Sequence, residues 1–352
     1  MKGVIIMIKN LILKLQLPAL LIVSSISMIH QPETETKKTT QKIEQSLDTI
    51  DTIKTQKNIT KEESLIKVLN NKGYTNTEIE VIYENLSQEQ IGYLISRNYI
   101  NITEYLKYPY FDFSKLDRYV TYQKTNNIEI KDTIIKVNIG LDNDFYTNTV
   151  TIENPDNLLV LVNKYNQLPS DYIPNNLTQL KCNSKYQLQQ EAAVSFDCLV
   201  DAAKTENVNI YPYSAYRSYE YQNKIYNRYV KKDGQELADT YSARPGYSEH
   251  QTGLSIDIRS IGYNRIKESD YEWMKQNAHH YGYIIRYPEN STNITGYQEE
   301  PWHLRYVGVE AATEIKQLGI TLDEYHQIKL LSNNLNNEKE NQFQKTKQKE
   351  DI

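Results

Sequence analysis

Residues 248–257 of the chain read SEHQTGLSID, and residues 300–303 read EPWH. The two segments hold two of the six histidines, together with a carboxylate at a fixed offset from each. A catalytic zinc site consists of three nitrogen or oxygen ligands, an open position for water and a separate base. Because the two segments together contain these groups, they predict a hydrolytic zinc centre.

The spacing between His250 and Asp257 requires a bend in the chain. An odd offset on one continuous strand places two side chains on opposite faces. Gly253 lies between them and tolerates backbone conformations that other residues avoid. We therefore expect a turn at this glycine and a strand that starts at Leu254 and directs Asp257 towards the metal.

The second segment, residues 300–303, predicts a general base and a ligand in a turn. It does not have the pattern of zinc peptidases in which one helix carries two histidine ligands. Pro301 disfavours the helical conformation for Glu300, so we expect a turn that leads into a strand at His303. The pattern His-Glu-x-x-His of helical zinc peptidases is absent from the sequence. Glu300 is therefore interpreted as the general base beside the ion.

These motifs resemble the VanY-type D-alanyl-D-alanine carboxypeptidases, which belong to subfamily B of the M15 zinc peptidases. The resemblance extends to LVNKYNQLP at residues 161–169, YRSYEYQ at residues 216–222 and TGY at residues 295–297. It covers residues 137–320 and differs at Ser255, where the family more often has another small residue, alanine.

The resemblance implies an α+β fold in which helices flank a small mixed or antiparallel sheet, as in the Hedgehog and D-Ala-D-Ala peptidase group. It implies one zinc ion per chain, with His250, Asp257 and His303 as ligands. Glu300 matches the catalytic base of the family.

Three further residues match the part of the family site that contacts the substrate. Arg217 corresponds to the arginine that stabilises the carbonyl oxyanion or the substrate. Gln222 and Ser248 correspond to residues that hold the terminal D-alanine. A guanidinium and polar side chains near the metal suit recognition of a terminal carboxylate.

The implied activity is a zinc-dependent D,D-carboxypeptidase that removes the terminal D-Ala from peptidoglycan stem peptides. Two alternatives within the class are an L,D-carboxypeptidase and a peptidoglycan endopeptidase. A third alternative is a non-catalytic cell-wall-binding module that keeps zinc for structure. Glu300 argues against the third, because a structural zinc site has no use for a base.

The N-terminus predicts export. Three lysines precede an apolar run at residues 15–29, as in a secretory signal. Fifteen helical residues span ~22 Å, less than the ~30 Å hydrocarbon core, so a cleaved signal peptide at residues 1–30 is favoured over a membrane anchor. Either form places the enzyme outside the cytoplasm, secreted or anchored to the outer face of the cell membrane. The net charge of −5 does not favour a nucleic-acid partner.

Composition divides the rest of the chain. We expect a disordered linker at residues 31–60, a small all-α module at 61–120, the zinc carboxypeptidase domain at 136–330 and a disordered tail at 331–352. Within the module, capping boxes are predicted at residues 75–78, 87–90 and 101–104.

Within the domain, helices and strands interleave in a way that is typical of α+β proteins. Strands are predicted at residues 137–141, 158–162, 210–217, 254–258 and 304–308. Helices are predicted at residues 187–204, 218–229 and 270–281, the last one ending at Gly282. Cys182 and Cys198 are interpreted as two separate buried thiols rather than a disulfide, since one sequence does not establish proximity.

Overall fold

The computed structural model describes residues 63–330. The predicted signal peptide, the linker and the C-terminal tail lie outside the described residues. The described part of the chain divides into two compact units, residues 63–107 and residues 108–330. In the described part of the chain, no helix is both long and apolar enough to cross a membrane.

The described part of the first unit is helical. A helix at residues 63–71 precedes α3 (Asn76–Asn85), α4 (Gln88–Ser96) and α5 (Ile102–Leu106). The capping boxes predicted at Thr75 and Ser87 are both present. The third was wrong, because the Asn101 side chain makes no capping hydrogen bond. The module buries its apolar side chains, which include Leu69, Ile79, Ile82, Ile91, Leu94 and Ile102.

The second unit begins with helices where a strand was expected. A short 3₁₀ turn, η1 (Phe113–Lys115), leads into α6 (Leu116–Asn126), which is followed by α7 (Ile130–Ile139). The strand predicted at residues 137–141 was wrong, because Ile134 and Val137 continue a buried helical face and α7 ends at Gly140, with φ 105°. Residues 108–120, expected in the helical module, group with this second unit.

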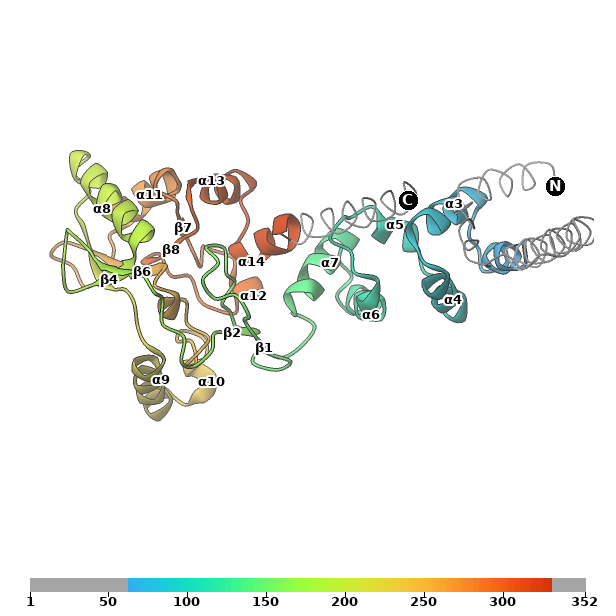
Figure 1. Ribbon diagram of the computed structural model, residues 1–352, viewed down its shortest axis with the longest axis horizontal. Helices are drawn as coiled ribbons and strands as arrows, with labels where there is room; N and C mark the ends of the chain where they lie inside the picture. The colour runs from blue at the N-terminus through green and yellow to red at the C-terminus, as the bar shows by residue number, and fades with distance from the viewer. Residues whose placement is uncertain (1–62, 331–352) are drawn as a thin grey trace, which may run out of the picture. The chain divides into compact units, whose positions relative to one another are not determined.

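An antiparallel sheet of four strands holds the centre of the second unit, in the order β5-β6-β8-β7 (Figure 1). The strands are β5 (Ile210–Ser214), β6 (Ser255–Ser260), β7 (Tyr283–Ile285) and β8 (His303–Tyr306). In the register, Asp257 pairs with His303 across β6 and β8 and with Ser214 across β5 and β6. This small antiparallel sheet with flanking helices confirms the α+β fold class.

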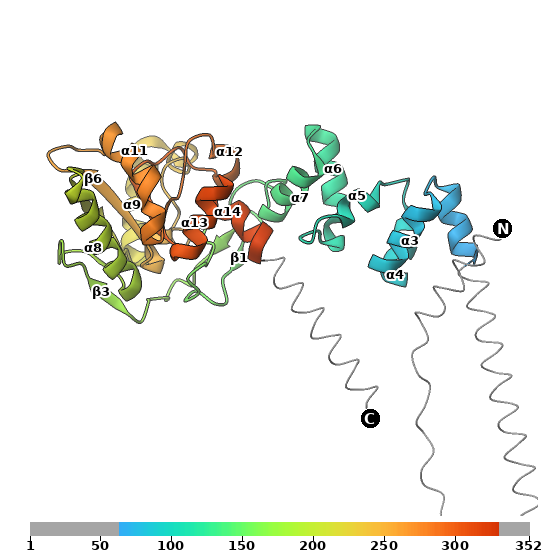
Figure 2. The same cartoon turned by 90° about the horizontal axis from the view of Figure 1, so that it is seen from above.

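Helices cover both sides of this sheet. In Figure 1, α8 (Gln190–Thr205), α11 (Glu268–Asn277) and α13 (Val309–Leu318) lie above it, and α9 (Tyr219–Asp233) and α10 (Gln235–Ala238) lie below it. The view in Figure 2 shows α8 and α13 from above, together with α12 (Thr292–Thr295) and α14 (Leu322–Tyr325). The main core packs α8 and α11 against β5, β6 and β8 through buried residues such as Phe196, Met274, Ile256 and Leu304.

The remaining strands and turns are short. A parallel pair is formed by β1 (Val150–Thr151) and β2 (Asn166–Gln167), and an antiparallel pair by β3 (Leu177–Gln179) and β4 (Gln187–Gln189). The predicted helix at 187–204 therefore starts later, at Gln190. The helix predicted at 270–281 ends at Asn277, and a 3₁₀ turn, η3 (Ala278–Tyr281), leads to Gly282, with φ 71°. Ser218 caps α9 as expected.

The strand predicted at residues 158–162 was wrong. This apolar segment is largely buried, but its carbonyl groups bond to a side chain instead of a neighbouring strand. Nη2 of Arg305 donates to the carbonyl oxygens of Leu158 and Val160, at 3.0 and 2.9 Å. A buried guanidinium thus satisfies polar backbone groups that a sheet would otherwise pair.

The two cysteines are separate, as predicted, but they are not buried. Cys182 and Cys198 are free thiols, and both residues are exposed. The expectation of burial was wrong because Cys198 lies on the outer side of α8, next to the buried Leu199.

Candidate active site

Strand pairing and one turn bring the three predicted zinc ligands together. Asp257 on β6 is the register partner of His303 on β8. His250 lies in the 3₁₀ turn η2 (Glu249–Thr252), directly before the start of β6. Gly253 links the turn to the strand with φ 67°, which confirms the bend expected at this glycine.

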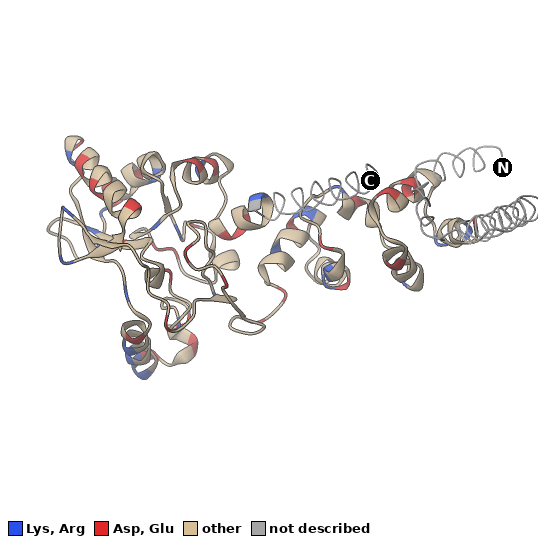
Figure 3. Ribbon diagram, viewed as in Figure 1, with Lys and Arg blue, Asp and Glu red and all other residues tan. Residues whose placement is uncertain are grey.

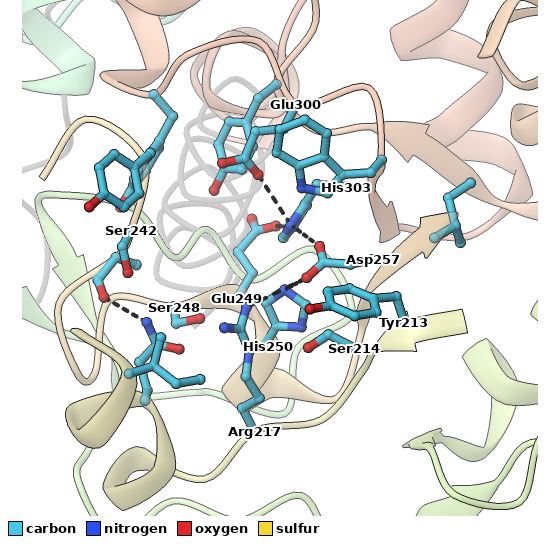
Figure 4. Close-up of a pocket in the computed structure, with 18 of the residues that line it drawn as sticks. Tyr213, Ser214, Arg217, Ser242, Ser248, Glu249, His250, Asp257, Glu300 and His303 are labelled. Atoms are coloured by element: carbon cyan, nitrogen blue, oxygen red, sulfur yellow. Dashed lines mark hydrogen bonds and ion pairs between the residues drawn. The ribbon is translucent and has the colours of Figure 1, made fainter. Parts of the chain in front are cut away.

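The three ligand residues form one compact cluster (Figure 4). Nε2 of His250 lies 3.3 Å from Oδ2 of Asp257, and Nδ1 of His303 lies 3.0 Å from Oδ1 of the same carboxylate. One nitrogen or oxygen atom of each residue lies within 4.8 Å of those of the other two. Nε2 of His250 and Oδ1 of Asp257 are buried without a hydrogen-bond partner in the structure. Buried polar atoms of this kind that converge on one point fit a zinc ion.

The pKa of Asp257 also suits a ligand. Burial acts to raise this pKa, but His250 and His303 outweigh burial and hold it well below its ordinary value. The carboxylate is therefore ionised at neutral pH, which is the form that binds a metal.

Each imidazole has a neighbouring oxygen at the ring nitrogen that does not face Asp257. Nδ1 of His250 donates to the carbonyl oxygen of Ala215 at 2.7 Å, which leaves Nε2 to face Asp257. Nε2 of His303 lies 3.6 Å from Oε2 of Glu249, close enough for an ion pair but not for a hydrogen bond, and Nδ1 faces the cluster. A hydrogen bond such as that of His250 fixes the tautomer and the ring orientation of histidines that bind metals.

Glu249 belongs to a buried ion cluster that the sequence analysis missed. Its Oε1 accepts from Nε of Arg286 at 2.7 Å and from Nη1 of Arg305 at 2.9 Å. Arg286 also donates to Asp323 at 2.7 Å, and Asp323 accepts from Asn163 at 2.8 Å. The side chains of Glu249, Arg286 and Arg305 are fully buried. The two guanidinium groups outweigh the burial of Glu249 and hold its pKa well below its ordinary value.

Glu300 lies beside the cluster, at the position expected of a base. Its Oε2 is 3.6 Å from Nδ1 of His303, and the residue is 8% exposed. Burial raises the pKa of this carboxyl to about 7, although His303 opposes the shift. A carboxyl group with a pKa near 7 can both accept and return a proton at neutral pH.

Arg217 lies on the opposite side of Asp257 from His303. Its Nη2 is 3.9 Å from Oδ2 of Asp257, and its Nε is buried without a partner in the structure. The backbone N–H of Arg217 donates to the carbonyl oxygen of His250 at 3.1 Å, which ties this arginine to the turn that carries a ligand. The guanidinium can therefore donate to an anionic oxygen next to the cluster.

Gln222 and Ser248 line the same cavity, which has a volume of about 710 Å³. Both residues are buried. Nε2 of Gln222 donates to the carbonyl oxygen of Ala243 at 2.7 Å, while its Oε1 has no partner in the structure. Gln222 thus retains an acceptor for a substrate N–H. Trp302 forms part of the wall.

Comparison with known proteins places the chain in a family. A family model described as VanY: D-alanyl-D-alanine carboxypeptidase matches residues 185–309. The putative carboxypeptidase YodJ of Bacillus subtilis (strain 168) is 43% identical over 189 residues, which cover 50% of this chain and 69% of that protein. The chain belongs to the VanY family of D-alanyl-D-alanine carboxypeptidases. It is therefore a carboxypeptidase.

Two further proteins are similar to the chain. The bifunctional D-Ala-D-Ala dipeptidase and D-Ala-D-Ala carboxypeptidase VanXYC of Enterococcus gallinarum is 33% identical over 182 residues, which cover 48% of this chain and 94% of that protein. Among solved structures, the LdcB LD-carboxypeptidase is 40% identical, with a TM-score of 0.48, and the match covers 53% of this chain and 94% of that one.

The VanY match at residues 185–309 includes every candidate site residue named from the sequence, together with Glu249, Arg286 and Arg305. Glu249 stands inside the segment 248–257, and Arg305 follows the segment 300–303 by two residues, so both lie in or next to the stretches of sequence that identified the site. Asp323 and Asn163 lie outside the family match. Asn163 stands in the segment 161–169 that shares the resemblance, whereas no feature of the sequence pointed to Asp323.

Proposed function

We propose that this VanY-family carboxypeptidase is a zinc-dependent D,D-carboxypeptidase that removes the terminal D-Ala from peptidoglycan stem peptides. The observation that carries the proposal is the convergence of His250, Asp257 and His303 next to a buried Glu300. A three-ligand cluster with a free carboxyl beside it matches a catalytic rather than a structural zinc site.

His250, Asp257 and His303 would hold one zinc ion through two nitrogen ligands and one carboxylate. Bound zinc supplies a Lewis acid that polarises the scissile carbonyl and increases the acidity of a nearby water. The carbonyl of Ala215 and the carboxylate of Glu249 hold the two imidazoles in the orientation that this requires.

The side chains around the ligands transfer the proton, stabilise the oxyanion and bind the substrate. Glu300 accepts the proton of the attacking water and passes it to the amine of the departing D-Ala. Arg217 donates to the oxyanion that develops on the carbonyl oxygen. Gln222 accepts an N–H of the substrate through its free Oε1, and Ser248 lies beside it in the cavity wall.

The test is the Glu300→Gln variant, assayed for bound zinc and for D-Ala release from a stem pentapeptide. We expect one zinc per chain to remain and turnover to fall by at least about 10²–10⁴-fold, the usual contribution of an acid–base group. Glu299→Gln is the matched control, because Glu299 is the exposed neighbour and does not line the cavity. Full activity in Glu300→Gln would reject the mechanism.

The same assay decides between the candidate substrates. The proposal predicts D-Ala release from the pentapeptide and not from the tetrapeptide. Release from the tetrapeptide alone would identify an L,D-carboxypeptidase, and cleavage within the stem would identify an endopeptidase.

We also propose that the enzyme acts outside the cytoplasm, secreted or tethered to the outer face of the membrane. The basic and apolar pattern of residues 1–30 supports this, and so does a substrate in the cell wall. Cell fractionation of the full chain and of a chain without residues 1–30 tests it. Retention of the shortened chain in the cytoplasm is the expected result.

A further inference from the structure

The cavity carries more positive side chains than the proposed reaction uses. Besides Arg217, the cationic residues that line it are Lys185, Arg228, Arg259 and Arg265. The acidic lining residues are Glu249, Asp257 and Glu300. All three acids belong to the zinc cluster or lie directly against it, so the walls further away carry positive charge alone. Figure 3 shows basic residues on α9, which forms one of these walls.

Two of these cations lie over aromatic rings that also line the cavity. Cζ of Arg259 is 3.1 Å from the centre of the Tyr213 ring, and Nζ of Lys185 is 5.3 Å from that of Tyr186. We call these four residues the basic wall. Within residues 63–330, neither cation has a carboxylate within 4.0 Å. An aromatic ring stabilises an exposed cation only weakly and does not neutralise it, so the charge remains available to a ligand.

The sheet places the basic wall beside the metal cluster. Asp257 and Arg259 are two residues apart on β6, so their side chains project from the same face. Their Cα atoms are separated by about 7 Å, the length of two residues of a strand. Tyr213 comes from β5, which pairs with β6 at the edge of the sheet.

Tyr213 of the basic wall and Ser248, one of the proposed D-alanine contacts, lie on different sides of the metal cluster. In Figure 4, Tyr213 lies on one side of the His250–Asp257 pair, and Ser242 and Ser248 lie on the other. If Gln222 and Ser248 hold the departing residue, the chain that precedes the scissile bond extends towards Arg259. About two extended residues cover the separation between Asp257 and Arg259.

We infer that the basic wall binds a free carboxylate of the stem peptide, on the acyl side of the scissile bond and within about two residues of it. This inference rests on the proposed function. Arg259 would donate two N–H groups to the carboxylate, and Lys185 would add a second positive charge. Stem peptides with a free carboxylate at this point would then be preferred over the corresponding amides.

The experiment measures kcat/KM for D-Ala release from two matched pairs of pentapeptides. One pair carries diaminopimelate or its side-chain amide at the third residue, and the other carries D-isoglutamate or D-isoglutamine at the second. We expect the wild-type zinc enzyme to prefer the carboxylate member of one pair by at least about tenfold, since the carboxylate accepts charge-assisted hydrogen bonds that are stronger than those of the neutral amide. The pair that shows the preference identifies which carboxylate is bound.

Arg259→Gln should remove that preference, Arg259→Lys should retain part of it, and added salt should weaken it. Arg228→Gln is the control, because Arg228 is a cation of the cavity lining that lies on α9 and not in the basic wall, so its loss should change both members of a pair equally. Equal rates for both members of each pair in the wild type, or a preference that survives Arg259→Gln, would overturn the inference.

Calorimetric binding of the same peptides to the zinc-loaded Glu300→Gln protein separates this inference from the proposed reaction. A carboxylate preference in binding that depends on Arg259 supports the basic wall even if no D-Ala is released. Release of D-Ala without such a preference keeps the proposed function and rejects the basic wall.

Discussion

Oε2 of Glu249 lies 3.6 Å from Nε2 of His303, at the edge of the ring opposite to Nδ1, which faces Asp257. The carboxylate is held by two guanidinium groups, so its position and charge are set before any metal arrives. One proposed zinc ligand is thereby connected through Arg286 to Asp323 on α14. The buried ion cluster is thus part of the support of the metal site as well as of the core.

We predict that Glu249→Gln weakens zinc binding and destabilises the protein. The amide cannot balance Arg286 and Arg305, and breaking a buried ion pair from one side costs about 3–5 kcal/mol. Loss of the carboxylate behind His303 should also lower zinc affinity by about 10–100-fold. Chelator competition measures the affinity, and thermal unfolding of the metal-free protein measures the stability.

Asp323→Asn separates the two effects, because Asp323 pairs with Arg286 and does not contact His303. We expect a similar loss of stability but an affinity for zinc close to that of the wild type. An equal loss of zinc affinity in both variants would show that general destabilisation, and not the contact of Glu249 with His303, is responsible.

The convergence of the proposed zinc ligands was predictable because its signal is local. His250, Gly253 and Asp257 stand in one short segment whose bend follows from a single glycine, and the structure brings them together with His303 as expected. The partners of Arg286 were not predictable, because Asp323 reaches it only through the docking of α14. Charged residues are mostly exposed, so a single sequence gives no reason to bury these.

Secondary structure was likewise predicted correctly where it depends on residues nearby in the sequence, and wrongly where it depends on distant ones. Ser218 and the capping boxes at Thr75 and Ser87 were predicted correctly, because a cap depends on residues three positions apart. The apolar segment at residues 158–162 was misjudged, because Arg305 binds its carbonyls from a distant strand. Short apolar runs do not distinguish a strand from another buried segment.

Gly253→Ala should reduce both stability and zinc affinity. The φ of 67° costs an alanine about 1–2 kcal/mol, and its Cβ would lie 2.9 Å from Cδ2 of Leu177 and 3.3 Å from the backbone nitrogen of Gln189. Since the turn carries His250, its displacement should also disturb the metal site. Thermal unfolding and zinc titration measure the two effects.

Gly262→Ala is the control for this substitution. Gly262 has a φ of 81° but no atom within 4 Å of the added Cβ, and it lies beyond the end of β6. It should show the conformational cost alone, with unchanged zinc affinity. If both variants bind zinc as the wild type does, the bend at Gly253 is not what positions His250.

The two thiols should react separately. Because Cys182 and Cys198 are free and exposed, we expect two equivalents of thiol reagent to react with the native protein. Cys182 should react more slowly, since burial of the thiol and the Asp197 carboxylate raise its pKa to about 12. Detection of no free thiol, with a lower unfolding temperature after reduction, would indicate a disulfide instead.

The metal-free enzyme should lose stability between pH 4.5 and 7 because of Glu300. Burial raises the pKa of this carboxyl from 4.5 to about 7, so the folded state retains a proton that the unfolded state has released. The unfolded state then binds fewer protons in this window, and the free energy of unfolding falls as the pH rises. At pH 7 and above, the raised pKa of Glu300 lowers the free energy of unfolding by about 3 kcal/mol at most.

Glu300→Gln removes this titration. The metal-free variant should match the wild type near pH 4 and exceed it in unfolding temperature at pH 8, whereas Glu299→Gln should follow the wild type throughout. In the zinc-loaded protein the difference should shrink, because a nearby cation favours the ionised carboxylate and lowers its pKa. Parallel profiles for Glu300→Gln and the wild type would mean that Glu300 ionises normally, and the proton transfers proposed for it would then need another group.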